Sequence, residues 1–415
     1  MKLSSLHLRT LKEAPKDETS LNASLLVRAG YVEKLTSGVY NFLPLGLRVI
    51  KKIENIIREE MNQIGGQEIL MAALQPKQNW EQTNRWQTFN ALFKVQSNTK
   101  QWYALGPTHE EIVTPLAQKL VFSYKDLPFA LYQIQTKFRD EPRSKSGLLR
   151  TREFLMKDLY SFHASEKDLD AYYEKVKKSY IKIFKKLNLK VLLVEASGGT
   201  FSRYSHEFQV ATDAGEDTLY YCPHCGFCQN AEIIEGKTTC PVCHHPLEQL
   251  KGIEVGNIFK LKDKYSQPFG FKFKDLDGQE QPVQMGCYGI GVSRIMGALA
   301  EVSNDKKGLI WPISVAPFEY YLLPLLSGQE RQDKLIKKQT EVIIQKLESS
   351  QKEFLVDDRE EVTNGEKLMD SDLLGIPYRI IVSAKTLEKQ SIEFKERKTN
   401  KIKLINLKNF AMLMK

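Results

Sequence analysis

The clearest pattern in the chain is helical. Between Leu47 and Met61, apolar side chains return every three or four positions, at Val49, Ile50, Ile53, Ile56 and Ile57. This spacing places them on one side of an α-helix, so it predicts an amphipathic helix with one buried face. The pair Gly65-Gly66 ends the helix, and the apolar run over 68–74 predicts a buried strand after it.

A different period begins at residue 130. Tyr132, Ile134 and Phe138 share one parity, and the other parity is polar: Gln133, Gln135, Lys137, Arg139 and Glu141. Such alternation predicts a strand with one apolar and one polar face. A second strand is expected over 152–163. The basic loop between the two contains Arg143, Lys145 and Arg150, and the whole predicts an antiparallel hairpin.

The remaining pattern predicts two groups of elements. A helix is expected over 166–187, then strands over 258–265 and 268–275, then a glycine-rich entry into a helix over 285–301. A proline-containing linker follows at 311–317. Strands and helices then alternate to the C-terminus, with helices expected over 331–348 and near 370–374. This alternation predicts a separate α/β domain of about 100 residues.

Composition indicates a globular protein of two or three domains. The 415 residues are 42% hydrophobic and 27% charged, which excludes a disordered or fibrous chain. The apolar runs are far shorter than the ~18 residues that span a bilayer, so no membrane association is expected. The 60 basic and 51 acidic residues leave a net charge of +9, which permits a polyanionic partner such as RNA without requiring one.

The N-terminus has no continuous apolar run of the kind that signal peptides carry. It is weakly amphipathic, with Lys2, Arg9 and Lys12, which leaves an organelle transit peptide open. A reducing, cytoplasmic location is the simpler interpretation.

Five of the six cysteines are clustered. Two CxxC pairs, separated by fourteen residues, are formed by Cys222, Cys225, Cys240 and Cys243. Four thiolates in this arrangement can surround a tetrahedral Zn²⁺, so the spacing predicts a zinc-ribbon-like segment over 220–250. Reduced thiols without metal are the alternative. Cys228 and His224 are spare donors nearby, so the ligand set is less certain than the site.

Three residues of the hairpin suggest nucleotide chemistry. Arg139 and Glu141 lie two positions apart, so both side chains point to one face of the strand. A guanidinium suits an α-phosphate because its planar fork makes bidentate hydrogen bonds. The carboxylate can accept from an exocyclic amine, and Phe154 on the return strand can stack on adenine. A surface Arg–Glu pair is the ordinary alternative.

A glycine-rich segment adds weight to the nucleotide interpretation. Gly286, Gly289 and Gly291 precede a helix that carries Arg294. Glycines allow close backbone approach, and a helix N-terminus favours anions. Arg294, one turn in, could reach a γ-phosphate. A tight strand-to-helix turn is the alternative, and the chain has no GxxxxGK[ST] phosphate-binding loop.

In this order, three segments resemble the signature motifs of class II aminoacyl-tRNA synthetases. LTSGVYNFLPLGLRVIKKIENIIREEM resembles motif 1, KFRDE with RTREFLMKD resembles motif 2, and GCYGIGVSR resembles motif 3. Within that class, LGPTHEE, YQIQTKFRDE, MKDLYSFH and SHEF resemble the prolyl-tRNA synthetases of bacterial type. The resemblance runs from near residue 1 to past residue 400, which argues against a transit peptide.

The resemblance implies the architecture and the site. A class II α+β catalytic domain, an antiparallel sheet with flanking helices, is expected over 1–315, and a C-terminal α/β anticodon-binding domain over 316–415. ATP, with Mg²⁺, would be held by Arg139 at the α-phosphate, Glu141 and Phe154 at adenine, and Arg150 and Arg294 at the β- and γ-phosphates. The residues implied for proline are Thr108, Glu110, Arg152, Asp158, His163, His206 and Cys287.

Within this set, Thr108 and Glu110 offer a matched acceptor pair for the two N–H donors of a secondary ammonium. Arg152 is the candidate for the substrate carboxylate. For His163 and His206, a purely structural role is the alternative.

The implied reaction has two steps. The proline carboxylate attacks the α-phosphorus of ATP to give prolyl-adenylate and pyrophosphate, and the terminal adenosine of tRNA(Pro) then takes the prolyl group. Positioning and charge neutralisation suffice, without a covalent nucleophile. A homodimer through motif 1 is also implied. The alternatives are a non-catalytic tRNA-binding paralogue, against which the intact arginines argue, and a synthetase for another amino acid, against which GPTHEE and SHEF argue.

The chain departs from the family in two places. Many bacterial members carry a large editing domain between motifs 2 and 3, but Asp158 and Gly286 bracket only about 130 residues here, so no such domain is expected. In the C-terminal domain, LVDDRE and DLLGIPYRIIV carry the resemblance, whereas EEVTNGEKLM has Val362 where an arginine is often found. Arg359 and Lys367 are therefore weak candidates for anticodon reading. The basic tail over 395–415 could contact phosphates or simply be solvated.

Overall fold

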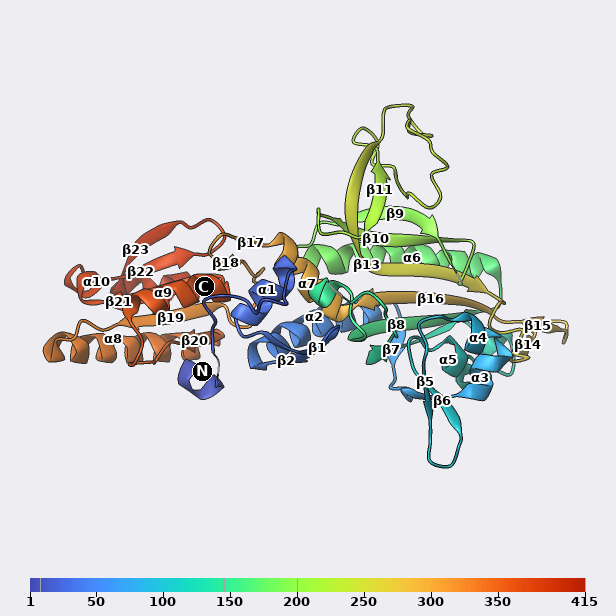
Figure 1. Ribbon diagram of the computed structural model, residues 1–415, viewed down its shortest axis with the longest axis horizontal. Helices are drawn as coiled ribbons and strands as arrows, with labels where there is room; N and C mark the ends of the chain where they lie inside the picture. Colours follow the sequence, from blue (N-terminus) through green and yellow to red (C-terminus); the bar gives the residue numbers. More distant parts are fainter. Residues whose placement is uncertain (8, 145, 200, 415) are drawn as a thin grey trace. The chain divides into compact units, whose positions relative to one another are not determined.

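The computed structural model describes residues 1–7, 9–144, 146–199 and 201–414 and divides into two compact units (Figure 1). One unit contains Met1–Lys34, Asn41–Lys52 and Leu299–Lys415, and the other contains Leu35–Tyr40 and Ile53–Ala298. Lys145 and Lys415, which belong to the predicted basic loop and basic tail, lie outside the described residues. The boundary at 315/316 stays a prediction.

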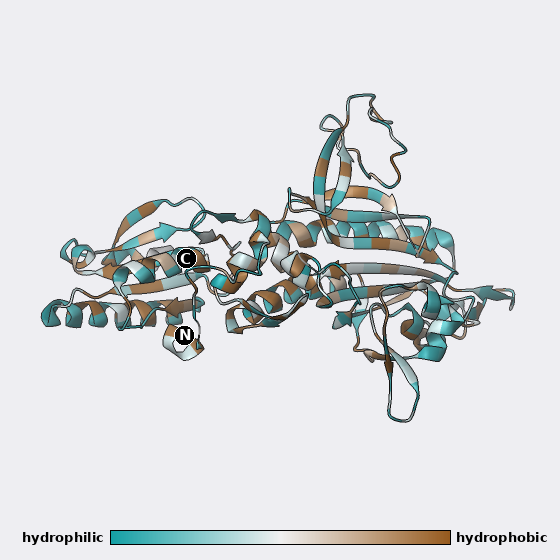
Figure 2. Ribbon diagram, in the orientation of Figure 1, coloured by the Kyte–Doolittle hydropathy of each residue, from teal (hydrophilic) through white to brown (hydrophobic). Residues whose placement is uncertain are grey.

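The helices with their bounds are α1 (Leu21–Arg28), α2 (Pro44–Gln63), α3 (Lys77–Gln82), α4 (Arg85–Thr88), α5 (Glu110–Gln118), α6 (Glu166–Lys186), α7 (Val292–Val302), α8 (Glu330–Ser349), α9 (Asn364–Leu374) and α10 (Ala384–Glu388). Among the described residues, no helix is long and apolar enough to cross a bilayer. Figure 2 shows hydrophilic and hydrophobic residues along the same helices, as amphipathic packing requires.

A nine-stranded, mainly antiparallel sheet forms the centre of the larger unit. Its order is β10-β9-β12-β11-β13-β16-β8-β7-β3. The strands are β10 (Tyr204–Ala211), β9 (Leu192–Ser197), β12 (Cys228–Asn230), β11 (Asp217–Tyr221), β13 (Glu248–Lys262), β16 (Gln284–Gly291), β8 (Glu153–His163), β7 (Phe129–Phe138) and β3 (Gly66–Glu68). The predicted hairpin is confirmed, because β7 and β8 pair antiparallel with Gln133 opposite Asp158.

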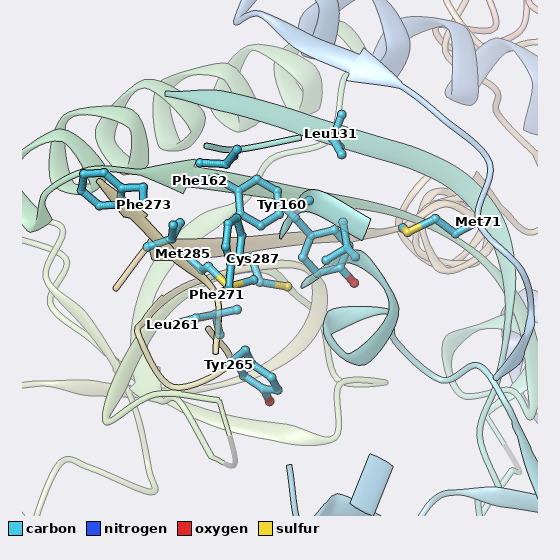
Figure 3. Packing of buried hydrophobic residues seen from close by; sticks show 14 residues of the cluster. Met71, Leu131, Tyr160, Phe162, Leu261, Tyr265, Phe271, Phe273, Met285 and Cys287 are labelled. Carbon is cyan, nitrogen blue, oxygen red and sulfur yellow. The ribbon is translucent and has the colours of Figure 1, made fainter. Parts of the chain in front are cut away.

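The two faces of this sheet are covered differently. On one face lies α6, whose buried side chains include Tyr173, Tyr180 and Phe184 (Figure 1). Over part of the other face, Tyr160, Phe162 and Cys287 pack with residues from α5 and from the segment after β13, as Figure 3 shows. The smaller strands nearby are β4 (Leu74–Pro76), β5 (Phe93–Gln96), β6 (Trp102–Leu105), β14 (Lys272–Lys274) and β15 (Glu280–Pro282).

Helix α2 confirms the predicted amphipathic helix, and Gly65 follows it with a φ of 87°. The strand predicted over 68–74 is wrong, because only β3 and β4, at its two ends, are extended pairs. Between them the backbone bonds to side chains of β7. Gln133 Oε1 accepts from the Met71 N–H at 2.9 Å, and Gln135 donates to the Met71 carbonyl.

The smaller unit contains a five-stranded sheet of order β20-β19-β21-β22-β23. The strands are β20 (Phe354–Val356), β19 (Tyr320–Leu325), β21 (Tyr378–Ser383), β22 (Ser391–Glu396) and β23 (Ile402–Asn406). The β19 pairings are parallel and the β22 pairings antiparallel. Helices α8 and α9 confirm the two predicted helices, with α9 beginning earlier than expected. The short pairs β1 (Val32–Thr36)–β2 (Val39–Phe42) and β17 (Asn304–Asp305)–β18 (Gly308–Leu309) complete the strands.

Candidate active site

Seven of the predicted site residues line one cavity of about 180 Å³ on the sheet face opposite α6: Thr108, Glu110, Arg139, Phe154, Asp158, Cys287 and Arg294. Strand pairing explains why. Lys137 lies opposite Phe154 and Gln133 opposite Asp158 across the hairpin, while Gly289 lies opposite Asp158 on β16. Side chains directly opposite each other share a face of the sheet. The polar side chains of β7 and the even-numbered side chains of β8 therefore point to the face on which the cavity lies.

Two guanidinium groups stand at this cavity. Arg139 follows β7, and its buried Nε has no hydrogen-bond partner among the described residues. Its guanidinium carbon lies 5.2 Å from the centroid of the Phe154 ring. Burial, and then the nearby charge of Arg294, lower the pKa of Arg139. A buried cation with an unused donor and a like charge beside it is a site prepared for an anion.

Gly289 helps to keep this cavity open. It lines the cavity, and a Cβ built at this position would meet no atom closer than 4.0 Å, so a side chain would extend into the space. Gly286 is required by packing instead, because a Cβ at this position would lie 2.2 Å from the hydroxyl of Tyr288. Gly291 also lines the cavity, and a Cβ there would lie 3.1 Å from the Cβ of Arg294. Of the three glycines predicted to admit phosphates, Gly289 and Gly291 are therefore at the cavity.

An adjoining cavity of about 220 Å³ is lined by Glu141, Arg150, Glu216, Asp217, Glu254 and Arg294. Glu254 and Arg294 line both cavities, so the two are neighbours. Arg150 donates to Glu141 at 2.6 Å and also to Glu216. Arg294 Nη1 donates to Glu254 Oε2 at 3.2 Å. The five residues predicted to bind ATP thus line two adjoining cavities.

The acceptor pair of Thr108 and Glu110 also lines the first cavity. Thr108 Oγ1 donates to Glu110 Oε2 at 2.5 Å, and Cys287 Sγ donates to Glu110 Oε1 at 3.0 Å. All three residues are buried. Burial, and then the charge of Glu110, raise the pKa of the Cys287 thiol, so it stays a proton donor. The carboxylate is held on both oxygens by neighbours and can accept a further cationic donor.

Asp158 has two buried neighbours that can carry charge, Lys137 and His109. Lys137 Nζ lies 2.9 Å from Asp158 Oδ1, and both residues are fully buried. Burial alone would raise the pKa of Asp158, but the ammonium of Lys137 holds it below its ordinary value. Burial, and then the same ammonium, lower the pKa of His109 to about 4, so this imidazole is neutral. The polar parity of β7 already marked Lys137; no sequence signal marked His109.

The structure places the two predicted histidines on the other face of the sheet. His163 is five positions from Asp158 on one strand, so their side chains point to opposite faces. Its ring bonds to Asp168 at 2.7 Å and to Ser161 at 2.8 Å. His206 lies opposite Ile258 and contacts the Tyr173 hydroxyl of α6 at 2.7 Å. Both histidines therefore stabilise the packing of α6, contrary to the expected position.

Arg152 also differs from expectation. Its Nε donates to the Glu141 carbonyl at 3.1 Å and its Nη1 to the Ser37 carbonyl at 2.9 Å. These backbone partners join the hairpin loop to the β1–β2 turn. Arg139 lines the first cavity, whereas Arg152 is not among the residues that line either cavity, so Arg139 is better placed to receive a carboxylate.

The four cysteines of the two CxxC pairs come together. Cys222 Sγ lies 3.4 Å from Cys243 Sγ, and Cys225 Sγ lies 3.5 Å from Cys240 Sγ. All four sulfur atoms lie within 4.8 Å of one another, a geometry that suits one tetrahedral ion. Cys228 is separate: it packs with Val194 and Leu219, and burial raises the pKa of its thiol to about 12. His224 groups instead with His245 and Cys243.

The two weak candidates for anticodon reading, Arg359 and Lys367, contact residues of the smaller unit. Arg359 pairs with Asp357 at 2.7 Å and with Asp370 at 2.9 Å. Lys367 is buried and donates to the Asp357 carbonyl at 3.3 Å. Both side chains hold the segment after β20, so neither is free in this structure to contact a base.

Comparison with known proteins agrees with this geometry. The model of the tRNA synthetase class II core domain (G, H, P, S and T) matches residues 93–303, and the anticodon binding domain model matches 320–415. The fold resembles the structure of Giardia lamblia prolyl-tRNA synthetase in complex with prolyl-adenylate, with a TM-score of 0.79, 21% identity, and coverage of 94% of this chain and 75% of that one. The chain is thus a class II tRNA synthetase in fold.

Curated relatives show to which family of class II synthetases the chain belongs. The proline–tRNA ligase of Ehrlichia chaffeensis is 39% identical over 432 residues, covering 100% of both chains, and that of Anaplasma phagocytophilum is 40% identical over 425 residues, covering 98% of both. The Dehalococcoides mccartyi (strain CBDB1) enzyme is 32% identical over 557 aligned positions, covering 98% of this chain and 97% of its own. The chain belongs to the proline–tRNA ligase family.

Proposed function

We propose that this protein activates proline with ATP and transfers it to the 3′ end of tRNA(Pro), releasing AMP and pyrophosphate. One observation carries the proposal. A single cavity is lined by Arg139, whose buried Nε has no hydrogen-bond partner among the described residues, and by the buried acceptor pair of Thr108 and Glu110. An amino acid needs both ends, because its carboxylate must meet a phosphate while its ammonium is held in place.

The residues then have distinct tasks in adenylate formation. Glu110 and Thr108 receive the secondary ammonium of proline, which directs the substrate carboxylate toward Arg139. Arg139 binds the α-phosphate at the point of attack, where negative charge develops in the transition state. Cys287, with Phe201 and Phe259, forms the wall beside the pyrrolidine ring. Asp158 also lines this cavity, and its ion pair with Lys137 cancels its charge and fixes its position.

The nucleotide occupies the two adjoining cavities in this proposal. Adenine stacks on Phe154 and meets Glu141, and the β- and γ-phosphates meet Arg150 and Arg294. Arg150 is held by Glu141 and Glu216 in this structure, so phosphate replaces a carboxylate as its partner. The guanidinium of Arg150 therefore has an anionic partner both before and after ATP binds.

The residues present also fit Mg²⁺. Asn257 donates to both Glu254 and Glu207, at 3.0 and 3.3 Å. Gln209 donates to Glu207 and to Asp217, at 2.9 and 2.6 Å. Carboxylate oxygens are ligands that Mg²⁺ accepts together with ATP phosphates. Glu254 and Asp217, which line the nucleotide cavities, would hold the ion, and the ion would neutralise phosphate charge.

Zinc is proposed at Cys222, Cys225, Cys240 and Cys243, with a structural role. The support is the convergence of four thiols on one point from two CxxC turns. In these turns, Cys222 N–H donates to the Phe227 carbonyl and Cys240 N–H to the His245 carbonyl, at 2.8 Å each. The segment lies apart from the residues lining the nucleotide cavities, so the ion would stabilise this segment and take no part in adenylate chemistry.

A homodimer is proposed through motif 1. Strand β3, which follows motif 1 (residues 35–61) in the chain, is an edge of the nine-stranded sheet, and Leu70, just beyond it, is 78% exposed. An exposed apolar side chain at a sheet edge suits a second copy of the chain. Sedimentation should show a dimer that Leu70→Glu dissociates; a monomeric wild-type protein would contradict the proposal.

The proposal includes tRNA binding by the anticodon-binding domain and a cytoplasmic location, and it includes no editing in cis. The alignment with the Dehalococcoides enzyme has 557 positions, which exceeds the 415 residues of this chain by 142. That excess is the size of an additional domain. This chain therefore has no counterpart for a domain-sized part of that relative.

The test is pyrophosphate exchange into ATP with each of the twenty amino acids. Proline should support exchange at least ten times faster, at equal concentration, than any other amino acid. Exchange driven best by another amino acid would assign a different synthetase. No exchange with any amino acid, despite tRNA binding, would favour the non-catalytic paralogue.

A further inference from the structure

Arg85 is a deeply buried arginine that lies behind the proposed proline site without lining the cavity. Only 6% of its side chain is exposed. It begins the short helix α4, directly after Asn84, whose φ is 59°. Its position in the sequence, 25 residues before Glu110, had suggested no role. Two of its donors, Nε and Nη2, have no hydrogen-bond partner among the described residues.

Two adjacent carboxylates face this guanidinium. Arg85 Nη1 lies 2.8 Å from Glu111 Oε1 and 3.6 Å from Glu110 Oε2, and both carboxylates are fully buried. Burial raises the pKa of Glu111, and Arg85 opposes that effect. Burial disfavours the charge on Arg85, yet the carboxylates raise the pKa of its guanidinium. The three groups form one unit with a net charge of −1, and without the cation two buried carboxylates would stand side by side.

Aromatic rings enclose the same guanidinium. Its carbon lies 4.8 to 5.5 Å from the ring centroids of Trp80, Phe89, Phe201 and Tyr265. Ring faces attract a cation and substitute in part for missing acceptors. Phe201 also lines the cavity, and its ring lies 4.9 Å from that of Phe259. The enclosure fixes Arg85 between the carboxylates and the cavity wall.

We infer that Arg85 is a positioning residue for proline recognition, acting through Glu110 by balancing the charge of the Glu110–Glu111 pair. The inference rests on the proposed function. Arg85 Nη1 lies between the two carboxylates, 2.8 Å from Glu111 Oε1 and 3.6 Å from Glu110 Oε2. Without this cation the two adjacent buried carboxylates would repel each other, so Glu110 would no longer be held where it accepts from the ammonium of proline. Neither Arg85 nor Glu111 lines either nucleotide cavity, so we expect the effect on proline binding to exceed the effect on ATP binding.

No other cation among the described residues forms an ion pair with Glu110 or Glu111. Thr108 and Cys287 donate neutral hydrogen bonds to Glu110. The charge of Glu110 also acts on Lys137 and Arg139, but Lys137 is paired with Asp158 and Arg139 faces Phe154. The hydroxyls of Tyr160 and Tyr265, the nearest phenols, are neutral because burial raises the pKa of each.

Arg85→Met removes the cation and nearly keeps the volume. We expect the KM for proline in pyrophosphate exchange to rise at least ~10-fold, with the KM for ATP within ~3-fold of wild type. The decisive variant is the double change Arg85→Met with Glu111→Gln, which restores a net charge of −1 on Glu110 alone. Its KM for proline should fall at least ~5-fold below that of Arg85→Met.

A structural role predicts the opposite, because a second buried change would make the site no better. A double variant with a KM for proline equal to or above that of Arg85→Met overturns the inference, as do equal rises in both KM values. Arg397→Met is the matched control. Arg397 is 2% exposed and pairs with Asp305 in the smaller unit, so its loss should lower the melting temperature and leave the KM for proline unchanged.

If Arg85→Met does not fold, Glu111→Gln alone keeps the inference testable. It leaves Arg85 with Glu110 as its one carboxylate, which weakens the attraction for the proline ammonium. The KM for proline should rise at least ~3-fold, and an unchanged value overturns the inference. A wild-type protein without proline-dependent exchange would instead remove the proposed function, so the two failures are distinguishable.

Discussion

Replacing Arg139 by alanine separates catalysis from stability at this site. The guanidinium makes one long hydrogen bond, 3.5 Å to the Pro107 carbonyl, and its Nε has no partner among the described residues. It also lies close enough to Arg294 for that charge to lower its pKa. Its removal therefore deprives the folded protein of little, and we expect the melting temperature to stay the same or rise.

The loss to adenylate formation should be large. A guanidinium about 4 Å from a phosphoryl charge is worth about 4 kcal/mol at an effective dielectric constant of about 20. Arg294 remains and recovers part of this energy. Loss of one preorganised donor to a transition-state anion costs ~10²–10³-fold in rate. We therefore expect proline-dependent pyrophosphate exchange to fall by ~10²–10³-fold in Arg139→Ala.

The assay is exchange at saturating ATP and proline, with thermal melting of the same preparation. Arg203→Ala is the control, because Arg203 stacks on Tyr204, outside both nucleotide cavities, and it should retain full exchange. Near-normal exchange in Arg139→Ala would refute the placement of the α-phosphate. A large fall in melting temperature would refute the claim that this cation is unpaired in the folded state.

Three further predictions concern the metal, acid stability and fidelity. Purified protein should carry about one Zn²⁺ per chain, and Cys240→Ser should lose it and lower stability before exchange activity; metal analysis without zinc contradicts this. Burial lowers the pKa of His109 to about 4 in the folded protein, whereas an unfolded histidine takes up a proton near pH 6.5. As the pH falls from 6.5 toward 4, the unfolded state therefore gains a proton that the folded state does not bind, and the free energy of unfolding decreases by about 3 kcal/mol. Urea titrations from pH 7 to 4 should show this loss and His109→Gln should lack it. Alanine should form adenylate detectably, because a missing ring contact discriminates by only about 1–3 kcal/mol, and the pure protein should leave preformed alanyl-tRNA(Pro) intact; hydrolysis above the buffer rate would reveal an editing site.

Alternation along the chain was sufficient to predict the part of the sheet that carries the site. The parity of Gln133, Lys137 and Arg139 predicted the polar face of β7, and the structure has that face at the cavity or beside it. The strand predicted over 68–74 failed for a reason that apolar character does not reveal. Its backbone groups at Met71 bond to side chains of β7, and that contact depends on residues about 60 positions away.

The residues that the resemblance implied for ATP line two adjoining cavities, and their roles stay predictions, whereas the two implied histidines lie on the other face of the sheet. SHEF and MKDLYSFH carried the family wording, yet strand parity sets His163 apart from Asp158, and His206 pairs with Ile258 on the α6 side. Considering parity along β8 could have found the first of these differences. Arg85 had no local signal, because its two carboxylate partners, Glu110 and Glu111, are distant in sequence and meet it only in the folded protein.

The proposed reaction ends with proline esterified to tRNA(Pro), so charging of this tRNA is the deciding measurement. The measurement is incubation of the protein with ATP, Mg²⁺, labelled amino acid and a tRNA(Pro) transcript, followed by separation of charged from uncharged tRNA. The account predicts proline ester at the 3′ end, none with a tRNA transcript of another identity, and a strong reduction in Arg139→Ala. Efficient charging with a different amino acid, or proline-dependent exchange without any charging of tRNA(Pro), would contradict it.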